Sequence, residues 1–415
     1  MNVLLINTAD TKGGAGKVAY QLKTALKKKG HHPSLLVSRK YSKDEDVRLI
    51  RPDYNLRRRI LKKLTYYLAN DLDLFPSKHI LKMPEFINAD IVHCHNLHTN
   101  YFNLTALTKI AAIKPVVWTF HDMWPITAHC AHSFDGKLKE SGFFTCPSLD
   151  IYPPIAWHNE KYLETKKTKI YANSNLNIVT PSKWLADKVS QSILKDKPLS
   201  VIYNGIDTSI FKPWGKQKCR QELGLPIEKR IVLVVAKGGQ SNPWKGGKYA
   251  QMALEALKGD PGVLFVDLGG DTNETIDNTK IVSFVESRDL LAKYYSAADV
   301  LLYPSIADNC PLVVLEAMAC GLPVVSFNTG GIPELVEHKI NGYIAEYKNI
   351  NDLKSCLEYL LNLPPQETEK MRQYSADKAL AEFTSEKMAD QYIKVYEDIL
   401  SNRRQASALG VKQAL

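Results

Sequence analysis

Two acidic side chains in the C-terminal half of the sequence, Asp308 and Glu316, stand eight residues apart. Asp308 falls in a predicted loop that follows an apolar run, and Glu316 falls in the helix predicted after that loop. The first backbone N–H groups of such a helix have no partner within the helix, so they can hold a phosphate group. The segment therefore combines two carboxylates with a predicted anion site.

Two lysines, Lys237 and Lys245, also stand eight residues apart, just after the apolar run Ile231–Ala236. Two glycines and a predicted helix follow Lys245. Two cations beside a helix N-terminus suit a diphosphate, because they would stabilise the negative charge that develops on a leaving group. The alternative is that both are surface lysines of a flexible loop.

A glycine-rich turn, Lys12–Lys17, follows the first apolar run, Asn2–Thr8. Glycines there let the backbone approach a bound group, and the next helix N-terminus favours an anion. A P-loop would place Ser or Thr after Lys17, where Val18 stands. The dinucleotide pattern G-x-G-x-x-G, with an acidic residue about 20 positions on, is not present. A plain tight turn and a loop that faces an acceptor or a phosphate both remain open.

Histidines follow two predicted strands, at the end of the sheet where open α/β folds bind ligands. They lie in the runs His93–His98 and Thr119–Asp122. Zinc is an alternative, because four more possible ligands lie near: His129, Cys130, His132 and Cys146. No C-x-x-C pair occurs, however, so we predict no metal site and favour His121 as a polar contact to substrate. Solvated or structural histidines are the other alternative.

Two α/β units in tandem would hold these residues, because short apolar runs typical of buried parallel strands alternate with helical stretches in each half. The runs are Asn2–Thr8, Ser34–Val37, Ala89–His93, Val116–Phe120, Ile231–Ala236, Val263–Leu268, Ile281–Val285, Val300–Tyr303 and Val324–Phe327. A helix is predicted around Tyr101–Ala111. The joint falls near Asn204–Pro213, where Asn, Gly, Asp and Pro cluster.

Bulk properties agree with a two-domain globular protein of 415 residues. The sequence has no basic, apolar leader and no run of 18 apolar residues, and its seven cysteines are irregularly spaced, so we expect reduced thiols in a cytoplasm. The charge is uneven. Residues 1–207 hold 30 Lys and Arg against 18 Asp and Glu, a net of +12, whereas residues 208–415 hold 24 against 26, a net of −2. The first half therefore suits an anionic partner.

Taken together, the motifs resemble the retaining glycosyltransferases of family 4, in a branch that builds bacterial surface polysaccharides. The most specific match is the string from Asp308 to Val325. The other matching pieces are Gly13–Gly16, the loop with His121-Asp122-Met123-Trp124, Pro181–Trp184, Asn204–Asp207, Lys245-Gly246, Ser296–Asp299 and Gly330–Glu334.

The resemblance implies a GT-B fold, with two Rossmann-like domains that face a central cleft. Residues 1–207 would bind the acceptor, and residues 208–384 would bind the nucleotide sugar. A C-terminal helix, 385–401, would pack back on the first domain. The expected reaction is metal-independent transfer of a sugar, from a UDP- or GDP-linked donor and without a cofactor, to a saccharide acceptor that is expected to be lipid-linked.

Roles for individual residues follow from the same resemblance. Lys245, helped by Lys237, would bind the donor diphosphate, and Glu316 would hold the ribose. Asp308 stands where the family has Glu, so its contacts to the sugar would be one methylene shorter. The backbone of Asn309, Cys310, Pro311, Leu312 and Val313 would meet the phosphates and sugar. His121, Lys245, Asp308 and Glu316 would form the catalytic set.

The first domain would supply the remaining contacts. Gly14 and Gly16 would approach the donor, and Gly13, His95, His121 and Asp122 would line the acceptor site. The family is thought to use front-face attack, in which the leaving phosphate takes the acceptor proton. Two other functions stay open: a P-loop-type ATPase or nucleotide-binding regulator that uses Lys12–Lys17, and a non-catalytic sugar-nucleotide binding protein.

A basic amphipathic helix is predicted at Tyr54–Ala69. Its apolar residues share one face and its cations fill much of the rest, which is typical of helices that lie in the headgroup region of an anionic membrane. The apolar set is Leu56, Ile60, Leu61, Leu64, Tyr67 and Leu68, and the cations are Arg57, Arg58, Arg59, Lys62 and Lys63. We therefore expect a cytoplasmic protein with a peripheral position on the inner face of the cell membrane. The alternative is a helix packed on its own domain; nucleic acid is disfavoured because no binding motif occurs.

Overall fold

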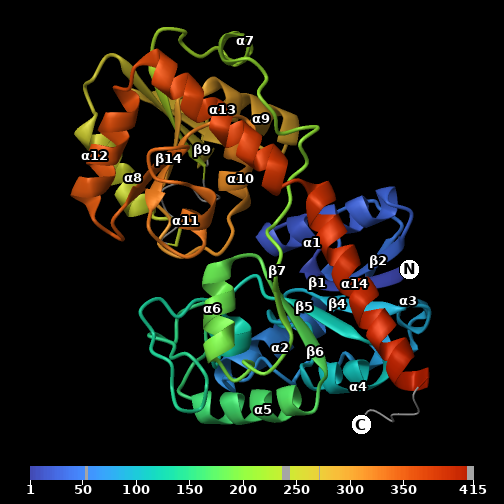
Figure 1. Ribbon diagram of the computed structural model, residues 1–415. Helices are drawn as coiled ribbons and strands as arrows, with labels where there is room; N and C mark the ends of the chain where they lie inside the picture. Colours follow the sequence, from blue (N-terminus) through green and yellow to red (C-terminus); the bar gives the residue numbers. More distant parts are fainter. Residues whose placement is uncertain (52–54, 236–243, 271, 409–415) are drawn as a thin grey trace. The chain divides into compact units, whose positions relative to one another are not determined.

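The structure, a computed structural model, describes residues 1–51, 55–235, 244–270 and 272–408. The chain divides into two compact units (Figure 1). Unit 1 holds residues 1–203 and the C-terminal segment from Glu386, and unit 2 holds residues 204–385. Each unit is a mixed α/β structure around a largely parallel sheet, which confirms the predicted fold class of two Rossmann-like domains.

Unit 1 contains a seven-stranded parallel sheet in the order β3-β2-β1-β4-β5-β6-β7 within the described residues. Its strands are β1 (Asn2–Ala9), β2 (His32–Arg39), β3 (Val47–Leu49), β4 (Ile91–Cys94), β5 (Val116–Thr119), β6 (Leu176–Thr180) and β7 (Leu199–Val201). The central strands are buried on both faces, as expected of a parallel sheet covered by helices.

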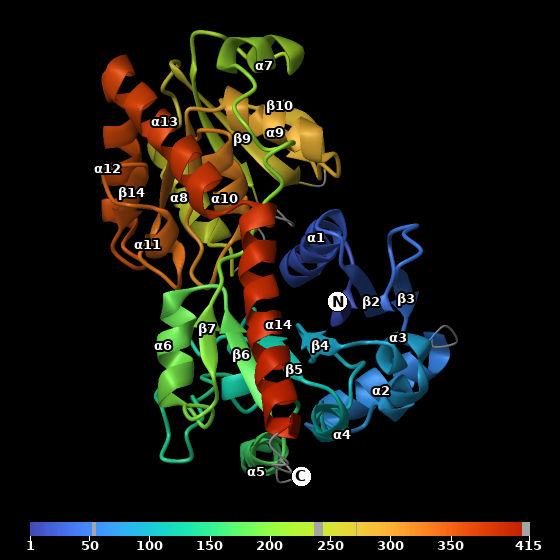
Figure 2. The same ribbon diagram turned by 45° about the vertical axis from the view of Figure 1, so that its right-hand side comes forward.

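Helices flank this sheet in unit 1. They are α1 (Gly14–Lys28), α2 (Asn55–Tyr67), α3 (Pro84–Ile87), α4 (Thr105–Ile113), α5 (Glu160–Ala172), α6 (Lys183–Gln191) and α14 (Ser385–Ala408), with two 3₁₀ turns at Lys78–Lys82 and Trp124–Ile126. Helices α1 and α6 contact the strands of the sheet directly. Helix α1 buries Val18, Leu22 and Leu26 at helical spacing. Figure 2 shows α14 running past β4 and β5 on the same sheet.

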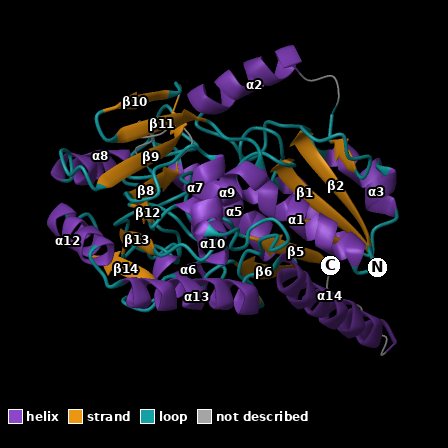
Figure 3. Ribbon diagram, turned by 90° about the horizontal axis from the view of Figure 1, so that it is seen from above, coloured by secondary structure: helices purple, strands orange, loops and turns teal. Residues whose placement is uncertain are grey.

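Unit 2 repeats the design, with the sheet order β10-β11-β9-β8-β12-β13-β14 and β10 as its antiparallel edge. The strands are β8 (Arg230–Val235), β9 (Val263–Gly270), β10 (Glu274–Ile276), β11 (Thr279–Ser283), β12 (Val300–Tyr303), β13 (Val324–Phe327) and β14 (Gly342–Ala345). The helices are α7 (Lys216–Glu222), α8 (Gly247–Ala256), α9 (Arg288–Ala297), α10 (Leu312–Ala319), α11 (Ile332–Leu335), α12 (Ile350–Leu361) and α13 (Pro365–Glu382). Helix α8 packs with α12, and α10 packs with α9 and α13 (Figure 3).

Element bounds differ from the predictions mainly at the edges of the sheets. Strands β3, β6, β7, β10 and β14 were not predicted, and β11 begins and ends two residues before the predicted Ile281–Val285. Helix α4 starts at Thr105 rather than near Tyr101, and α14 continues to Ala408. Short strands carry little sequence pattern because their pairing partners, not their own periodicity, define them.

Both sheets reverse their strand order beside their first strand, between β1 and β4 in unit 1 and between β8 and β12 in unit 2. Loops at the carboxyl ends of two such strands diverge to opposite sides of the sheet, which leaves a crevice where α/β proteins bind ligands. In unit 1 these loops carry Gly13 and His95. In unit 2, Lys245 follows β8 in the sequence and Asp308 follows β12.

The expectation of reduced thiols is wrong for one pair of cysteines. Cys130 and Cys146 form a disulfide, with their Cα atoms 5.9 Å apart. Folding of the long loop between β5 and α5 brings the two residues together, and their spacing in sequence gave no sign of it. The cysteines found free, at positions 94, 219, 310, 320 and 356, are buried.

Among the described residues, no helix combines the length and the apolar character needed to cross a membrane.

Two buried hydrogen bonds join α14 to the sheet of unit 1. Tyr396 Oη lies 2.6 Å from His93 Nδ1 on β4, and Tyr392 Oη lies 2.8 Å from Thr119 Oγ1 on β5. The second ring nitrogen of His93 bonds to Thr119, at 2.8 Å. Both nitrogens of this fully buried histidine are therefore occupied by structural partners.

Replacing Tyr396 with phenylalanine should lower the free energy of unfolding by roughly 1–3 kcal/mol, because it leaves a buried His93 nitrogen without its partner. The matched control is Tyr359→Phe, which removes a hydroxyl from a side chain that is 57% exposed and should change stability little. Thermal and denaturant unfolding measure both. Equal, small effects would contradict this role for Tyr396.

Candidate active site

The predicted donor residues of unit 2 converge on a cluster of Lys245, Tyr303 and Asp308, which we call the Lys245 cluster. Lys245 Nζ forms an ion pair with Asp308 Oδ2 and lies 2.9 Å from Tyr303 Oη. Tyr303 Oη donates to the same Asp308 oxygen at 2.5 Å. The three side chains close a triangle at the carboxyl end of β12, with 33% of the Lys245 side chain still exposed.

The electrostatics of the cluster keep the lysine charged. Burial lowers the pKa of Lys245, but the Asp308 carboxylate and the Tyr303 hydroxyl outweigh this effect and hold that pKa above its ordinary value. Burial and the neighbouring carboxylate raise the pKa of Tyr303, so its hydroxyl stays protonated. The cluster therefore presents a fixed cation with one side open to solvent.

Close backbone packing places Lys245 beside Asp308. The Trp244 carbonyl accepts hydrogen bonds from the Ile306 amide at 3.1 Å and from Ser305 Oγ at 3.1 Å. Gly246 has a φ of 70°, and a Cβ there would lie 1.7 Å from the Pro304 carbonyl oxygen. Only glycine fits this contact, which explains the Lys-Gly pair after β8.

The segment after Asp308 leads into helix α10. Asn309, Cys310, Pro311 and Leu312 are buried, and Val313 is half-buried. The Cys310 carbonyl accepts a hydrogen bond from Asn204 Nδ2 at 2.9 Å, and the Asn309 carbonyl accepts one from the Gly331 amide at 3.0 Å. These bonds fix the start of a helix whose first N–H groups can face an anion.

Glu316 lies inside helix α10 and is 3% exposed. Tyr295 Oη on helix α9 donates to its Oε2 at 3.3 Å. A carboxylate held in this way could accept hydrogen bonds from hydroxyl groups of a ligand. Lys237, the predicted second lysine, lies outside the described residues.

Three of the predicted acceptor residues, His95, His121 and Asp122, belong to a second group, which we call the histidine cluster. Its other members are His93 and His98. His95 Nδ1 and His121 Nε2 lie 2.9 Å apart, so one proton is shared between two neutral rings. His98 Nε2 lies 2.8 Å from Asp122 Oδ2, and the Trp124 amide donates to Asp122 Oδ1 at 3.0 Å.

Burial keeps His93, His95 and His121 neutral near pH 7. It lowers the pKa of His121 to about 4, against the opposing effect of Asp122, and it lowers that of His95 well below the ordinary value. The pKa of His93 falls to about 3, mainly through burial. His93 is thus structural, whereas His121 is only half-buried and can offer hydrogen bonds to a ligand.

The glycine-rich turn opens helix α1. Gly13 is the residue before the helix, with a φ of 78°, and added Cβ atoms at Gly13 and Gly14 would meet nothing within 4 Å. Gly16 differs, because a Cβ there would lie 3.1 Å from the Asp10 carbonyl oxygen. Gly13 and Gly14 therefore leave room before a helix N-terminus, while Gly16 allows close packing. The Val18 side chain has no oxygen that could bind magnesium and packs in the core instead, so the P-loop alternative has no support.

The four residues of the zinc alternative have other contacts. Cys130 and Cys146 are bonded to each other, His129 Nδ1 lies 3.0 Å from the Pro153 carbonyl oxygen, and His132 stacks on Trp184. Within the described part of the chain, no three His, Cys, Asp or Glu side chains are grouped as metal ligands would be.

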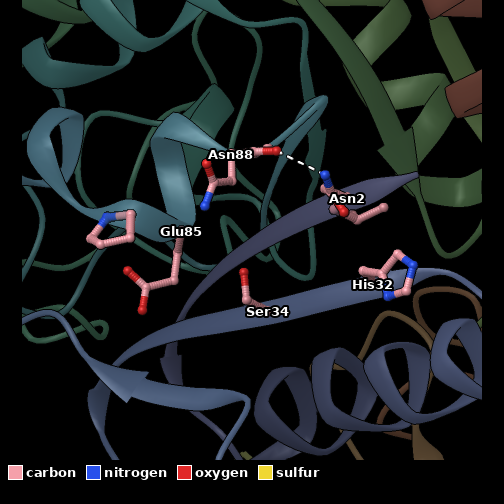
Figure 4. Close-up of a pocket in the computed structure, with 8 residues that line it drawn as sticks. Asn2, His32, Ser34, Glu85 and Asn88 are labelled. Atoms are coloured by element: carbon pink, nitrogen blue, oxygen red, sulfur yellow. Dashed lines mark hydrogen bonds between the residues drawn. The ribbon is translucent and has the colours of Figure 1, made fainter.

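A hollow of about 220 Å³ lies at the opposite, amino end of the unit 1 sheet. Figure 4 shows Asn2, His32 and Ser34 of β1 and β2 facing Glu85 and Asn88, with a hydrogen bond from Asn2 Nδ2 to the Asn88 carbonyl at 3.0 Å. None of the predicted site residues lines it.

Sequence reasoning missed three members of these sites. Tyr303 looked like an ordinary strand residue, although its place at the last position of an apolar run, next to Pro304, is a signal that it reaches the carboxyl edge. Tyr295 contacts the site from helix α9, and local sequence gives no sign of it. Asn204 belongs to the matching piece Asn204–Asp207, but the sequence assigns it no role. His98 was noticed but given no partner.

Two family models match consecutive parts of the chain. Residues 12–210 match the family model described as Glycosyltransferase Family 4, and residues 216–378 match the one described as Glycosyl transferases group 1. A D-inositol 3-phosphate glycosyltransferase of Mycobacterium tuberculosis is 28% identical over 301 residues, which is 68% of this chain but only 58% of that protein's length.

Two solved structures share the fold. A sucrose-phosphate synthase from Thermosynechococcus elongatus has a TM-score of 0.71 and 18% identity, with 96% of this chain and 99% of that chain covered. The Anabaena protein HepE, in complex with UDP-glucose, has a TM-score of 0.63 and 17% identity, with 95% and 99% covered.

Gly330 holds the Asp308 loop in place, and its replacement by alanine should disrupt the loop. At Gly330, φ is 56° and a Cβ would lie 1.6 Å from the Asp308 carbonyl oxygen. Gly224→Ala is the matched control, because its φ is 60° but a Cβ would meet nothing within 4 Å. The control should lose roughly 1–2 kcal/mol of stability from backbone strain alone, and Gly330→Ala should lose clearly more in thermal unfolding. Equal losses of stability in the two variants would show that the close contact between Gly330 and the Asp308 carbonyl does not contribute to stability.

Proposed function

Because the chain belongs to the family-4 glycosyltransferases with the GT-B fold, we propose that it is a retaining enzyme that transfers a hexosyl group from a UDP- or GDP-linked sugar to a saccharide acceptor. The proposed role is in polysaccharide biosynthesis, with an acceptor carried on a lipid. The observation that carries the proposal is the Lys245 cluster, a charged lysine held beside a helix N-terminus at the switch point of a Rossmann-like sheet.

Unit 2 is the proposed donor domain. Lys245 would exchange its contact with Asp308 for the donor diphosphate, and the N–H groups at the start of α10 would bind the same phosphates. Glu316, buried and hydrogen-bonded by Tyr295, would accept bonds from the ribose hydroxyls. Asp308 would then be free to contact the sugar.

The proposed chemistry is front-face substitution. The bond between the anomeric carbon and the diphosphate oxygen breaks, and an acceptor oxygen bonds to the same face of the sugar. The acceptor proton moves to the departing phosphate oxygen. Lys245 and the α10 N-terminus would stabilise the charge on the leaving group, which is the usual largest contribution to such catalysis. These positive groups make a metal ion unnecessary in the proposed mechanism.

Unit 1 is the proposed acceptor domain. His121 and His95 form a neutral, shared-proton pair that could orient a hydroxyl group, with Asp122 next to them. Gly13 and Gly14 leave space before the N-terminus of α1. The net charge of +12 in residues 1–207 suits an acceptor that carries phosphate.

The named relatives support particular parts of the proposal. The solved HepE structure contains UDP-glucose, which favours a UDP-linked hexose as the donor. The mycobacterial relative is named for a phosphorylated acceptor. A lipid diphosphate saccharide shares this phosphate chemistry, and an enzyme that uses it would work at the cytoplasmic face of the cell membrane.

Lys245→Ala and Glu316→Ala should each lower the rate of transfer by roughly 10²–10³, because each removes a contact to the donor or to the developing charge. Lys370→Ala, at an exposed lysine of the same unit, is the control and should leave the rate unchanged. The assay is sugar transfer from radiolabelled UDP and GDP sugars to extracted acceptor lipids, with EDTA present throughout. Near wild-type turnover in both variants, or a strict need for added metal, would contradict the proposal.

A further inference from the structure

Helix α2 carries apolar side chains on the outside of unit 1. Ile60 is 53% exposed, Leu64 42% and Tyr67 66%, and Leu68, directly after the helix, is 48% exposed. Residues spaced by four, seven and eight positions share one face of a helix. The face that would normally pack on a core is therefore turned to solvent in this helix.

Contacts on the other side hold α2 in place. Thr65 is 3% exposed, and its Oγ1 donates to Asn100 Oδ1 at 2.6 Å. At the C-terminal end of the helix, the Tyr67 carbonyl accepts a hydrogen bond from Trp157 Nε1 at 2.9 Å. The apolar face is thus a fixed part of the surface and does not result from a loose helix end.

Trp157 extends this apolar face. Its side chain is 49% exposed, although its ring N–H is tied to α2. Tyr66 and Tyr67 stand edge to face, 5.2 Å apart, at the same end of the helix. Tryptophan and tyrosine prefer the boundary between water and the lipid chains, because one end of each ring is apolar and the other is polar.

Cations border the apolar face. Arg59 and Lys63 are exposed and lie four residues apart, so they form a row next to the row of Ile60 and Leu64. Lys62 is exposed as well. The helical segment, residues 55–67, contains five cations and no acidic residue.

We propose that α2 and Trp157 form a docking surface for an anionic lipid bilayer, with the apolar row in the headgroup region and the cations against lipid phosphates. The pattern of charged and apolar side chains distinguishes between the possible binding partners of this surface. A second copy of the chain would bring the same cations against each other, and a nucleic acid would leave the apolar row exposed. An anionic bilayer satisfies both parts of the surface.

This docking surface extends the proposed function, and its purpose rests on that function. The surface would hold unit 1 at the membrane, where a lipid-linked acceptor lies. The docking itself is tested separately from catalysis. The measurement is cosedimentation of the purified protein with vesicles of phosphatidylglycerol and phosphatidylcholine, or of phosphatidylcholine alone, at low and high salt.

Two variants and two matched controls complete the design. The charge variant replaces Arg59, Lys62 and Lys63 with Gln, and its control replaces three exposed lysines of unit 2, Lys218, Lys339 and Lys370, with Gln. The apolar variant replaces Ile60 and Leu64 with Ser, and its control replaces two exposed residues of unit 2, Ile276 and Leu380, with Ser. Circular dichroism checks that each protein is folded.

The wild type should bind anionic vesicles at low salt, and binding should weaken at high salt. The charge variant should bind roughly 100-fold more weakly and the apolar variant at least about tenfold more weakly, whereas both controls should bind like the wild type. Absence of wild-type binding at low salt, or equal losses in variants and controls, would overturn the proposal. So would a change of the apolar variant from dimer to monomer in light scattering with vesicle binding intact.

Donor binding distinguishes this failure from failure of the proposed function. All four substituted proteins should bind UDP or GDP sugars in solution as the wild type does, because the Lys245 cluster lies in unit 2. If the wild type transfers sugar but does not bind vesicles, only the docking proposal is overturned. A wild type that binds vesicles but no nucleotide sugar would overturn only the proposed function.

Discussion

The site in unit 2 depends on one interaction, the ion pair between Lys245 and Asp308. To bind a diphosphate, Lys245 would have to remain charged and in position before the ligand binds, although its side chain is partly buried. Asp308 and Tyr303 meet this need by holding the ammonium group and keeping its pKa high. In the proposed mechanism, a diphosphate would therefore compete with a carboxylate for Lys245. Asp in place of the Glu expected from the family resemblance would then affect donor binding as well as contacts with the sugar.

Backbone geometry makes this pair possible. Gly246 lies against the Pro304 carbonyl and Gly330 against the Asp308 carbonyl, so both sides of the Asp308 loop are packed more closely than any larger residue would allow. The two residues of the pair follow strands β8 and β12 in the sequence, and these strands lie side by side where the strand order of the sheet reverses. In unit 1, too, candidate site residues follow neighbouring strands: Gly13 follows β1, His95 follows β4 and His121 follows β5. In each unit the sheet places polar groups from distant parts of the sequence along one edge.

The sequence alone predicted what depends on local pattern. Apolar runs located most of the parallel strands, and the string from Asp308 to Val325 located a loop followed by a helix with Glu316 inside it. It did not predict what depends on partners from elsewhere in the chain. Tyr303 reads as a core residue until the fold brings Lys245 to it, and the link between Cys130 and Cys146 requires a folded loop. The amphipathic pattern at residues 54–69 predicted the helix, but only the structure shows that Ile60 and Leu64 face solvent. Lys237 lies outside the described residues, so its predicted role stays a prediction.

We propose that Lys245 binds the donor diphosphate and that Asp308 holds the lysine side chain in position before the donor binds. Calorimetric titration of UDP and GDP into the wild type and into Asp308→Asn tests it most directly, because asparagine keeps the size of the side chain and removes its charge. With the competing carboxylate neutralised, the variant should bind its preferred nucleoside diphosphate more tightly, by roughly three- to tenfold. Weaker binding by Asp308→Asn than by the wild type would contradict the account, because Asp308 would then support the diphosphate site instead of competing for it.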